Sequence, residues 1–332
     1  MKTQVLMSLL LVGTMGTSSA FAEEQQQSAT TSSAKMTDLQ KNEEKKGDID
    51  DEITNARMRA TLGSKSKWSF KSAVAYNGGS LVRPADRVRP NYRAGANVPA
   101  LTTLSGTMGA NYRMTDRDSL SMGTGISIRN PFHDDLTRSD FQDPRRENTT
   151  VERYQASTPY LEYSRAYKVG GMQMISGATY SHFTDSDTTK EMNAFGNMSF
   201  DQTVLVDLGT SNWSGGLSLS IDTTFYNGGM SEFAAAQGAQ QDDFGYGLYP
   251  FAEYTFNDTY SFRTVFGYFQ MVHYKETETD KARVEAQTPY QSMGIGISVS
   301  RDVYLYPNVQ FTPLDIRDDR TNVALSANLN LF

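Results

Sequence analysis

The chain has 332 residues, of which 21% are charged and 38% are hydrophobic, and its formal net charge is −7. This acidic balance excludes the basic surface that nucleic acid requires, and the body of the chain lacks the apolar run of about 18 residues that a membrane-spanning helix needs. Cysteine is absent, which excludes disulfides and thiolate metal sites, whereas 18 Tyr and 17 Phe argue against disorder over most of the chain.

Residues 1–22 have the organisation of a cleaved signal peptide. Lys2 precedes the apolar run VLMSLLLV, and AFA at residues 20–22 places small residues where a signal peptidase cuts. This apolar run is too short to cross a bilayer, so cleavage is favoured over a membrane anchor. We therefore expect an exported protein that begins at Glu23.

The next two segments precede the main pattern of the chain. Residues 23–52 are polar and have no sustained period, which predicts a disordered leader. Residues 53–66 are ambiguous, because Met58, Ala60 and Leu62 alternate with polar residues. This segment is either a lumenal or periplasmic segment or an extra strand.

From residue 67 onward a two-residue period recurs in one segment after another. The clearest example is WSGGLSLSIDTTFY, in which Trp213, Leu217 and Ile221 share one face and Ser and Gly fill the other. Such alternation predicts a strand with one apolar and one polar face. The polar faces carry Ser and Gly rather than Lys and Glu, and aromatic residues mark the ends of the apolar faces. These features favour a transmembrane barrel over a soluble β-sandwich.

Connections of alternating length separate the predicted strands. Short turns, such as TDRD and KVGG, alternate with long polar loops, and transmembrane barrels place short turns in the periplasm and long loops outside. The long loops are residues 78–100, 130–153, 185–197, 227–243, 275–287 and 315–320. We predict an all-β fold, a transmembrane antiparallel up-and-down β-barrel of about 12 strands over residues 67–332, because an even number closes antiparallel. The last strand, NVALSANLNLF, then pairs with the first and leaves no exposed edge.

The signal peptide, the repeated strand–loop pattern and the terminal Phe332 make the chain resemble bacterial outer-membrane β-barrel proteins of porin-like type. The resemblance covers residues 68–332 and indicates no narrower family. It implies an integral location in the bacterial outer membrane, a periplasmic leader at residues 23–52 and contact with lipid and lipopolysaccharide. It also implies that the barrel-assembly machinery reads Phe332, although Phe332 is one residue out of phase with Leu331 and Leu329.

The alternation also identifies charged side chains that point into the lumen, and both signs are present. Opposed basic and acidic walls favour small polar or zwitterionic solutes. Alternatively, the charges pair with one another and fill the barrel. The candidate pore-lining residues are Lys71, Arg113, Arg129, Glu162, Asp201, Asp207, Asp222, Glu253 and Arg263.

Two long loops carry clusters of charge. The first contains Arg83, Arg87, Arg89 and Arg93, which either bind anions or lipopolysaccharide phosphates at the mouth or form an ordinary solvated loop. The second, residues 130–153, mixes acidic residues with arginines in a spacing that matches no dedicated calcium loop. No metal site is therefore predicted.

Together these patterns predict a porin-like channel for the passive passage of small hydrophilic solutes, without a cofactor. The alternative is a closed structural or surface-interaction barrel whose extracellular loops bind a partner. The third hypothesis is an outer-membrane hydrolase. Because the three histidines stand in no spacing that pairs them with a serine nucleophile, we do not expect an enzyme.

Overall fold

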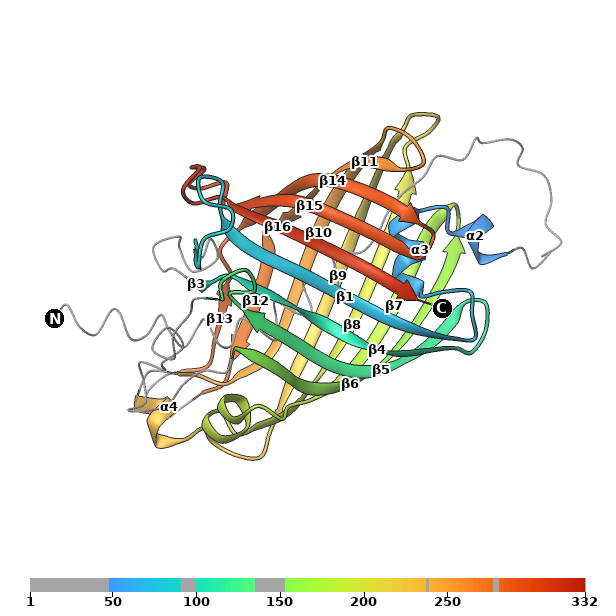
Figure 1. The fold of residues 1–332 in the computed structure, drawn as a ribbon. Helices are drawn as coiled ribbons and strands as arrows, with labels where there is room; N and C mark the ends of the chain where they lie inside the picture. Colours follow the sequence, from blue (N-terminus) through green and yellow to red (C-terminus); the bar gives the residue numbers. More distant parts are fainter. Residues whose placement is uncertain (1–47, 91–99, 135–152, 237–238, 277–280, 332) are drawn as a thin grey trace.

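The computed structural model describes residues 48–90, 100–134, 153–236, 239–276 and 281–331. Long antiparallel strands dominate them, and Figure 1 shows these strands tilted and wrapped into a barrel. No helix in the described ranges is long and apolar enough to cross a membrane.

Twelve barrel strands occur in the described residues, and each pairs with its neighbours in chain order. Two segments, β11 and β12, count as one strand because both pair with β10. The strands are β1 (Trp68–Ser80), β4 (Thr103–Arg113), β5 (Asp118–Arg129), β6 (Tyr154–Val169), β7 (Met172–His182), β8 (Ala194–Asp207), β9 (Trp213–Tyr226), β10 (Asp242–Thr255), β11 (Tyr260–Gly267) with β12 (Phe269–Tyr274), β14 (Tyr290–Ser300), β15 (Val303–Phe311) and β16 (Asn322–Leu331).

The last strand closes the barrel onto the first. β16 pairs antiparallel with β1, with Leu331 opposite Phe70 and Leu325 opposite Tyr76. The prediction of a 12-stranded antiparallel up-and-down barrel is confirmed. A chain can end on a strand here because closure leaves that strand paired on both sides. Phe332 lies outside the described residues.

Large apolar side chains cover the outside of the barrel. Trp68 is 61% exposed and Met122 is 57% exposed, although both residues lie within long strands. Trp213 packs edge-on against Tyr254, with ring centroids 5.1 Å apart, near the start of β9 and the end of β10. An apolar band flanked by aromatic residues suits a lipid environment.

The two ends of the barrel differ. Short connections join strands at the end that we call the turn end; between β6 and β7, for example, Gly170 and Gly171 adopt φ angles of 56° and 87°. At the opposite, loop end, the connections contain β2 (Val88–Arg89) paired with β3 (Ala100–Leu101), a π-helical turn (Asp187–Glu191), α4 (Glu232–Ala236) and β13 (Arg283–Ala286), which pairs with β12.

The segment before β1 lies inside the barrel at the turn end, as Figure 1 shows. It forms α2 (Ile49–Glu52) and α3 (Ala56–Leu62). Helix α2 thus lies in the last residues of the predicted leader, and α3 takes up residues 56–62 of the ambiguous segment 53–66. The side chain of Asn55 caps α3 by accepting a hydrogen bond from the Met58 amide, and Gly63 ends the helix at a φ of 93°.

The apolar core of the molecule is in the lumen. Ile49, Ile53 and Met58 are fully buried, and they join inward-facing side chains from two parts of the wall into one cluster. The partners are Ala166, Ile175 and Leu205 on β6–β8, and Tyr249, Phe251, Val265 and Tyr290 on β10, β11 and β14. We call residues 48–66 the lumenal segment; its burial of apolar surface stabilises its place inside the barrel.

Candidate functional site: the lumen

Ion pairs attach the lumenal segment to the turns at the turn end. Arg301, between β14 and β15, binds Asp50 with two hydrogen bonds of 2.8 and 3.0 Å. Lys65 Nζ lies 2.9 Å from the same carboxylate. On another side, Arg117, between β4 and β5, forms an ion pair with Glu52. Bidentate arginine–carboxylate pairs of this kind fix orientation as well as position.

These contacts keep Asp50 ionised. Burial alone would raise the pKa of the Asp50 carboxyl, but hydrogen bonds from Arg301 and Lys65 outweigh burial and hold the pKa below its usual value. Burial likewise opposes the charge of Arg301, and the hydrogen bond to Asp50 outweighs it and raises the Arg301 pKa. The ion pair is therefore fully charged at neutral pH.

A cluster of buried charge lies where α3 meets the wall. The Arg57 guanidinium lies 5.6 and 5.4 Å from the ring centroids of Tyr304 and Tyr306 on β15. Nearby, Arg263 stacks on a phenylalanine ring and lies 3.5 Å from a carboxylate oxygen of Glu253, with both charged groups almost wholly buried. Within the described residues, Arg57 Nε and Nη1 have no hydrogen-bond partner. The cluster thus contains two buried guanidiniums, and the Glu253 carboxylate pairs with that of Arg263.

Four of the predicted pore-lining residues lie at the turn end, beside the lumenal segment. Arg113 Nη1 donates a hydrogen bond of 3.3 Å to the Ser64 carbonyl. Asp207 accepts one of 3.5 Å from Gln173, which also accepts from the Asn55 amide. The other two are Glu253 and Arg263. These side chains point inward as predicted, but they contact the lumenal segment or lie buried near it.

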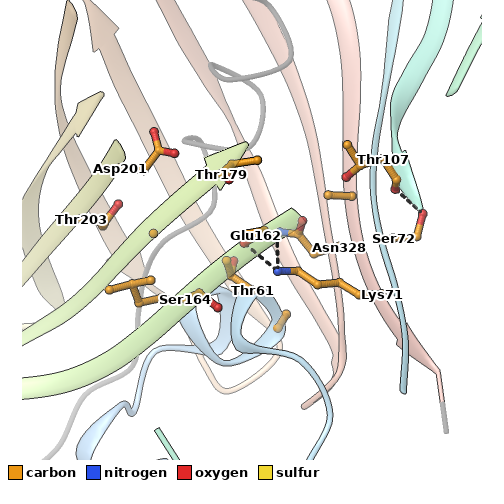
Figure 2. A pocket seen from close by; sticks show the side chains of 14 residues that line it. Thr61, Lys71, Ser72, Thr107, Glu162, Ser164, Thr179, Asp201, Thr203 and Asn328 are labelled. Atoms are coloured by element: carbon orange, nitrogen blue, oxygen red, sulfur yellow. Dashed lines mark hydrogen bonds and ion pairs between the residues drawn. The ribbon is translucent and has the colours of Figure 1, made fainter. Parts of the chain in front are cut away.

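Three predicted residues meet at a cavity of about 70 Å³ in the middle of the lumen. Lys71 Nζ lies 3.0 and 3.1 Å from the two carboxylate oxygens of Glu162, and Asp201 lines the same cavity (Figure 2). The side chains of Lys71 and Glu162 are only 10% and 15% exposed. Hydroxyl groups and one amide complete most of the polar lining: Thr61, Ser72, Thr107, Ser164, Thr179, Thr203 and Asn328.

The two remaining predicted residues lie toward the loop end. Arg129 is the last residue of β5, opposite Thr103. Asp222 accepts a hydrogen bond of 3.5 Å from Asn197, and Asn197 also donates to Thr224. The Thr224 hydroxyl in turn donates to Asp242, a carboxylate that was not among the predicted residues. With Asp201 on the neighbouring strand, these residues make the β8–β10 wall acidic.

Sequence reasoning missed the contribution of α3 to the cavity. Ala60 and Thr61 form one side of the cavity, and both belong to the segment that was left ambiguous. A helical signal was nevertheless present, because Asn55 is a good N-cap, residues 56–60 are strong helix formers and Gly63 suits a helix end. The two-residue alternation of the same residues masked it.

The arginine cluster of the first long loop is partly engaged within its own loop. Arg83 Nη1 lies 3.7 Å from Asp86, and Arg89 Nε donates to the Leu101 carbonyl across the β2–β3 pair. Arg87 belongs to the same described stretch, whereas Arg93 lies outside the described residues. Binding of anions or lipopolysaccharide by this loop stays a prediction.

Two histidines with polar contacts at the loop end form no catalytic pair. His133 Nε2 lies 2.8 Å from the Ala85 carbonyl. His273 stacks on Phe244 and lies 3.5 Å from Asp243. Neither contacts a serine hydroxyl in the described parts of the chain, and no group of three potential metal-binding side chains occurs among these residues.

Comparison with solved structures returns barrels from outer membranes. An outer-membrane channel from Pseudomonas putida F1 has a TM-score of 0.45 and 9% identity, and the match covers 81% of this chain and 98% of that one. The NanC porin has a TM-score of 0.39 and 12% identity, covering 79% and 99%. OmpF of Salmonella typhi, in complex with daunomycin, has a TM-score of 0.34 and 9% identity, covering 80% and 97%.

No family model and no curated relative matches the sequence. The architecture therefore comes from the barrel itself: twelve antiparallel strands in the described residues, closed by β1 and β16. Large apolar side chains lie outside, and the inside is polar apart from the apolar cluster around the lumenal segment. The chain has the fold of outer-membrane β-barrels of porin-like type, with no narrower family indicated.

Proposed function

We propose that the protein is an integral outer-membrane channel for the passive passage of small hydrophilic solutes. The observation that carries this proposal is the cavity in the middle of the lumen, lined by hydroxyls, an ammonium group and carboxylates. Space lined by several hydrogen-bonding groups holds water, whereas the core of a purely structural barrel is closed by apolar or fully paired side chains. The acidic β8–β10 wall favours cations over anions.

A closed structural or surface-interaction barrel is the second candidate. It is favoured by the lumenal segment, which contacts several walls at the turn end and joins two of them through one apolar cluster. In this case the partner-binding surface would be at the loop end, where Ala234 and Ala239 pack with Met192 and Met230 from neighbouring connections.

Single-channel conductance separates the two candidates. Residues 23–332 are refolded and reconstituted in a planar bilayer, and the reversal potential is measured in a salt gradient. The channel proposal predicts discrete conductance steps and a reversal potential of the sign that indicates cation selectivity. A barrel that is folded, as judged by its heat-modifiable mobility in gel electrophoresis, but never conducts would support the closed barrel instead.

The same proposal includes an export route. Cleavage of residues 1–22 would release a periplasmic leader, and the barrel-assembly machinery would recognise the last strand with Phe332. Amino-terminal sequencing of the protein purified from outer membranes tests the first step, because cleavage predicts Glu23 as the first residue.

A further inference from the structure

We propose that the cavity in the middle of the lumen is a binding site for small zwitterions that carry an ammonium and a carboxylate group, as amino acids do. The inference deepens the proposed channel function, on which it rests, by naming its solute class. Binding itself requires only that the solute reaches the cavity, so the two proposals can fail separately.

The first half of the site is the ion pair on β1 and β6. An ammonium group has three hydrogen-bond donors. Two donors of Lys71 reach the Glu162 oxygens at 3.0 and 3.1 Å. A third donor is left for the carboxylate of a solute, and Glu162 orients the Lys71 side chain along the cavity wall. Figure 2 shows the two side chains meeting, with dashed lines between Lys71 and Glu162.

The second half is Asp201, which lines the same cavity from β8. Glu162 is opposite Thr179 on β7, and Asp201 is opposite Gly177 on the same strand. Because neighbouring strands are about 4.8 Å apart, β6 and β8 stand about 10 Å from one another, with β7 between them. The Asp201 carboxylate is thus positioned to accept the ammonium group of a solute whose carboxylate contacts Lys71.

Gly177 leaves the room for that solute. It lines the cavity between the two charged groups and has no side chain of its own. A Cβ added there would meet only Asp201 Cβ at 3.8 Å and the Tyr163 carbonyl at 3.9 Å, which are ordinary contacts. The backbone therefore tolerates a larger residue at position 177. The cavity is open at this point because residue 177 is a glycine.

Size and charge restrict the occupant. A cavity of about 70 Å³ holds on the order of five waters, which suits a compact solute such as glycine. The lining contains one ammonium and two carboxylates. A simple anion would face both carboxylates, and a simple cation would leave the third Lys71 donor unused, whereas a zwitterion satisfies groups of both signs.

The test measures binding to the refolded chain of residues 23–332 in detergent by titration calorimetry. The probes are glycine, methylammonium and acetate. Glycine is expected to bind saturably and at least tenfold more tightly than either singly charged probe. Asp201→Asn and Lys71→Met are each expected to weaken glycine binding by tenfold or more.

Two further variants distinguish a loss of the binding site from a loss of folding. Gly177→Val fills the cavity without changing any charge and is expected to abolish glycine binding. Gly215→Ala adds a methyl group where no atom lies within 4 Å, and it is expected to leave binding unchanged. Heat-modifiable mobility confirms that each variant is folded.

The outcomes separate the two proposals. Methylammonium or acetate binding as tightly as glycine, or glycine binding that survives Gly177→Val, would overturn the zwitterion site. Conductance without saturable glycine binding would overturn the site while the channel proposal stands. Glycine binding by a barrel that never conducts would support the site and refute the channel.

Discussion

At the scale of single residues, the buried charges beside α3 carry the clearest energetic consequence. Arg57 and Arg263 are both fully buried, and the buried Glu253 carboxylate lies 3.5 Å from the Arg263 guanidinium. Burying a charge is costly unless it is paired and hydrogen-bonded, and replacing one member of such a group by an apolar residue is often neutral or stabilising. Removing the Glu253 carboxylate is the opposite case, because it takes away the counter-charge of the buried Arg263 guanidinium.

We therefore expect opposite results from two substitutions. Arg57→Met keeps much of the volume against Tyr304 and Tyr306 and should leave the free energy of unfolding unchanged or raise it by about 1–3 kcal/mol. Glu253→Gln should lower it by about 3–5 kcal/mol, because the buried Arg263 guanidinium then loses the carboxylate that lies 3.5 Å away. Urea unfolding of the refolded protein, followed by tryptophan fluorescence, measures both. A larger loss for Arg57→Met than for Glu253→Gln would contradict this account.

At the scale of elements, the turn between β6 and β7 depends on glycine. Gly170 and Gly171 have positive φ angles, and a Cβ added at either position would have no atom within 4 Å. A substitution there would therefore destabilise the protein only through backbone strain. Gly171→Ala should lower the free energy of unfolding by about 1 kcal/mol. Gly215→Ala, within strand β9 and equally open, is the matched control and should change it by less than about 0.5 kcal/mol. Equal effects of the two substitutions in urea unfolding would show that the turn geometry does not matter.

The attachment of α2 is an element-scale property that depends on pH. The folded-state pKa of Asp50 is lowered by Arg301 and Lys65, from an ordinary value of 3.8. A lowered carboxyl pKa contributes stability that is fully present above the ordinary value and is lost as the pH falls through the folded value. The contacts that hold α2 should therefore be complete at pH 7 and weaken progressively below about pH 4.

Hydrogen exchange of the α2–α3 amides, compared between wild type and Asp50→Asn, tests this dependence. At pH 7 the variant should exchange about tenfold faster, because it loses charge-assisted hydrogen bonds from two partners. At a pH below the folded pKa of Asp50 the difference should shrink, since the wild-type carboxyl is then protonated as well. A difference that persists undiminished in acid would mean that Asp50 acts by packing and not by charge.

At the scale of the whole molecule, the alternation of apolar and polar residues was enough to predict the barrel. The contacts between side chains on different strands could not be predicted, because they depend on the register of the strands. The prediction of a closed barrel, which rests on alternation, is confirmed, and Lys71, Glu162 and Asp201 line one cavity inside it. Alternation did not predict that Lys71 on β1 and Glu162 on β6 would pair, because that contact depends on the stagger of four successive strands and on side-chain length.

The lumenal segment was the other limit of sequence reasoning. Met58 and Leu62 are four residues apart, which suits a helix face, yet they also fit a period of two. Such short apolar patterns do not distinguish a helix from a strand. The local sequence also does not indicate whether a segment lies inside a barrel. Only the tertiary contacts, such as the hydrogen bond from Asn330 to the Ala60 carbonyl, establish that position.

In the proposed channel, solutes have to pass the lumenal segment, which involves the whole molecule. Its contacts reach Arg117, Gln173, Arg301 and Asn330, which lie on different sides of the turn end. An apolar cluster joins two parts of the wall, β6–β8 and β10–β14, through it. If the protein conducts as proposed and the segment moves to let solutes pass, fixing α3 to the wall should suppress conductance.

The chain has no cysteine, so an introduced pair of cysteines can form only the intended disulfide within the chain. Ala60→Cys with Asn330→Cys joins α3 to β16 at the point where these residues already share a hydrogen bond. The oxidised protein should show few or no conductance steps, and a reducing agent should restore them. Ser176→Cys with Gln202→Cys, opposite one another on β7 and β8, controls for oxidation and should leave the steps unchanged. Undiminished conductance of the oxidised Ala60→Cys, Asn330→Cys variant would mean that solutes pass beside α3, with the lumenal segment as a fixed constriction.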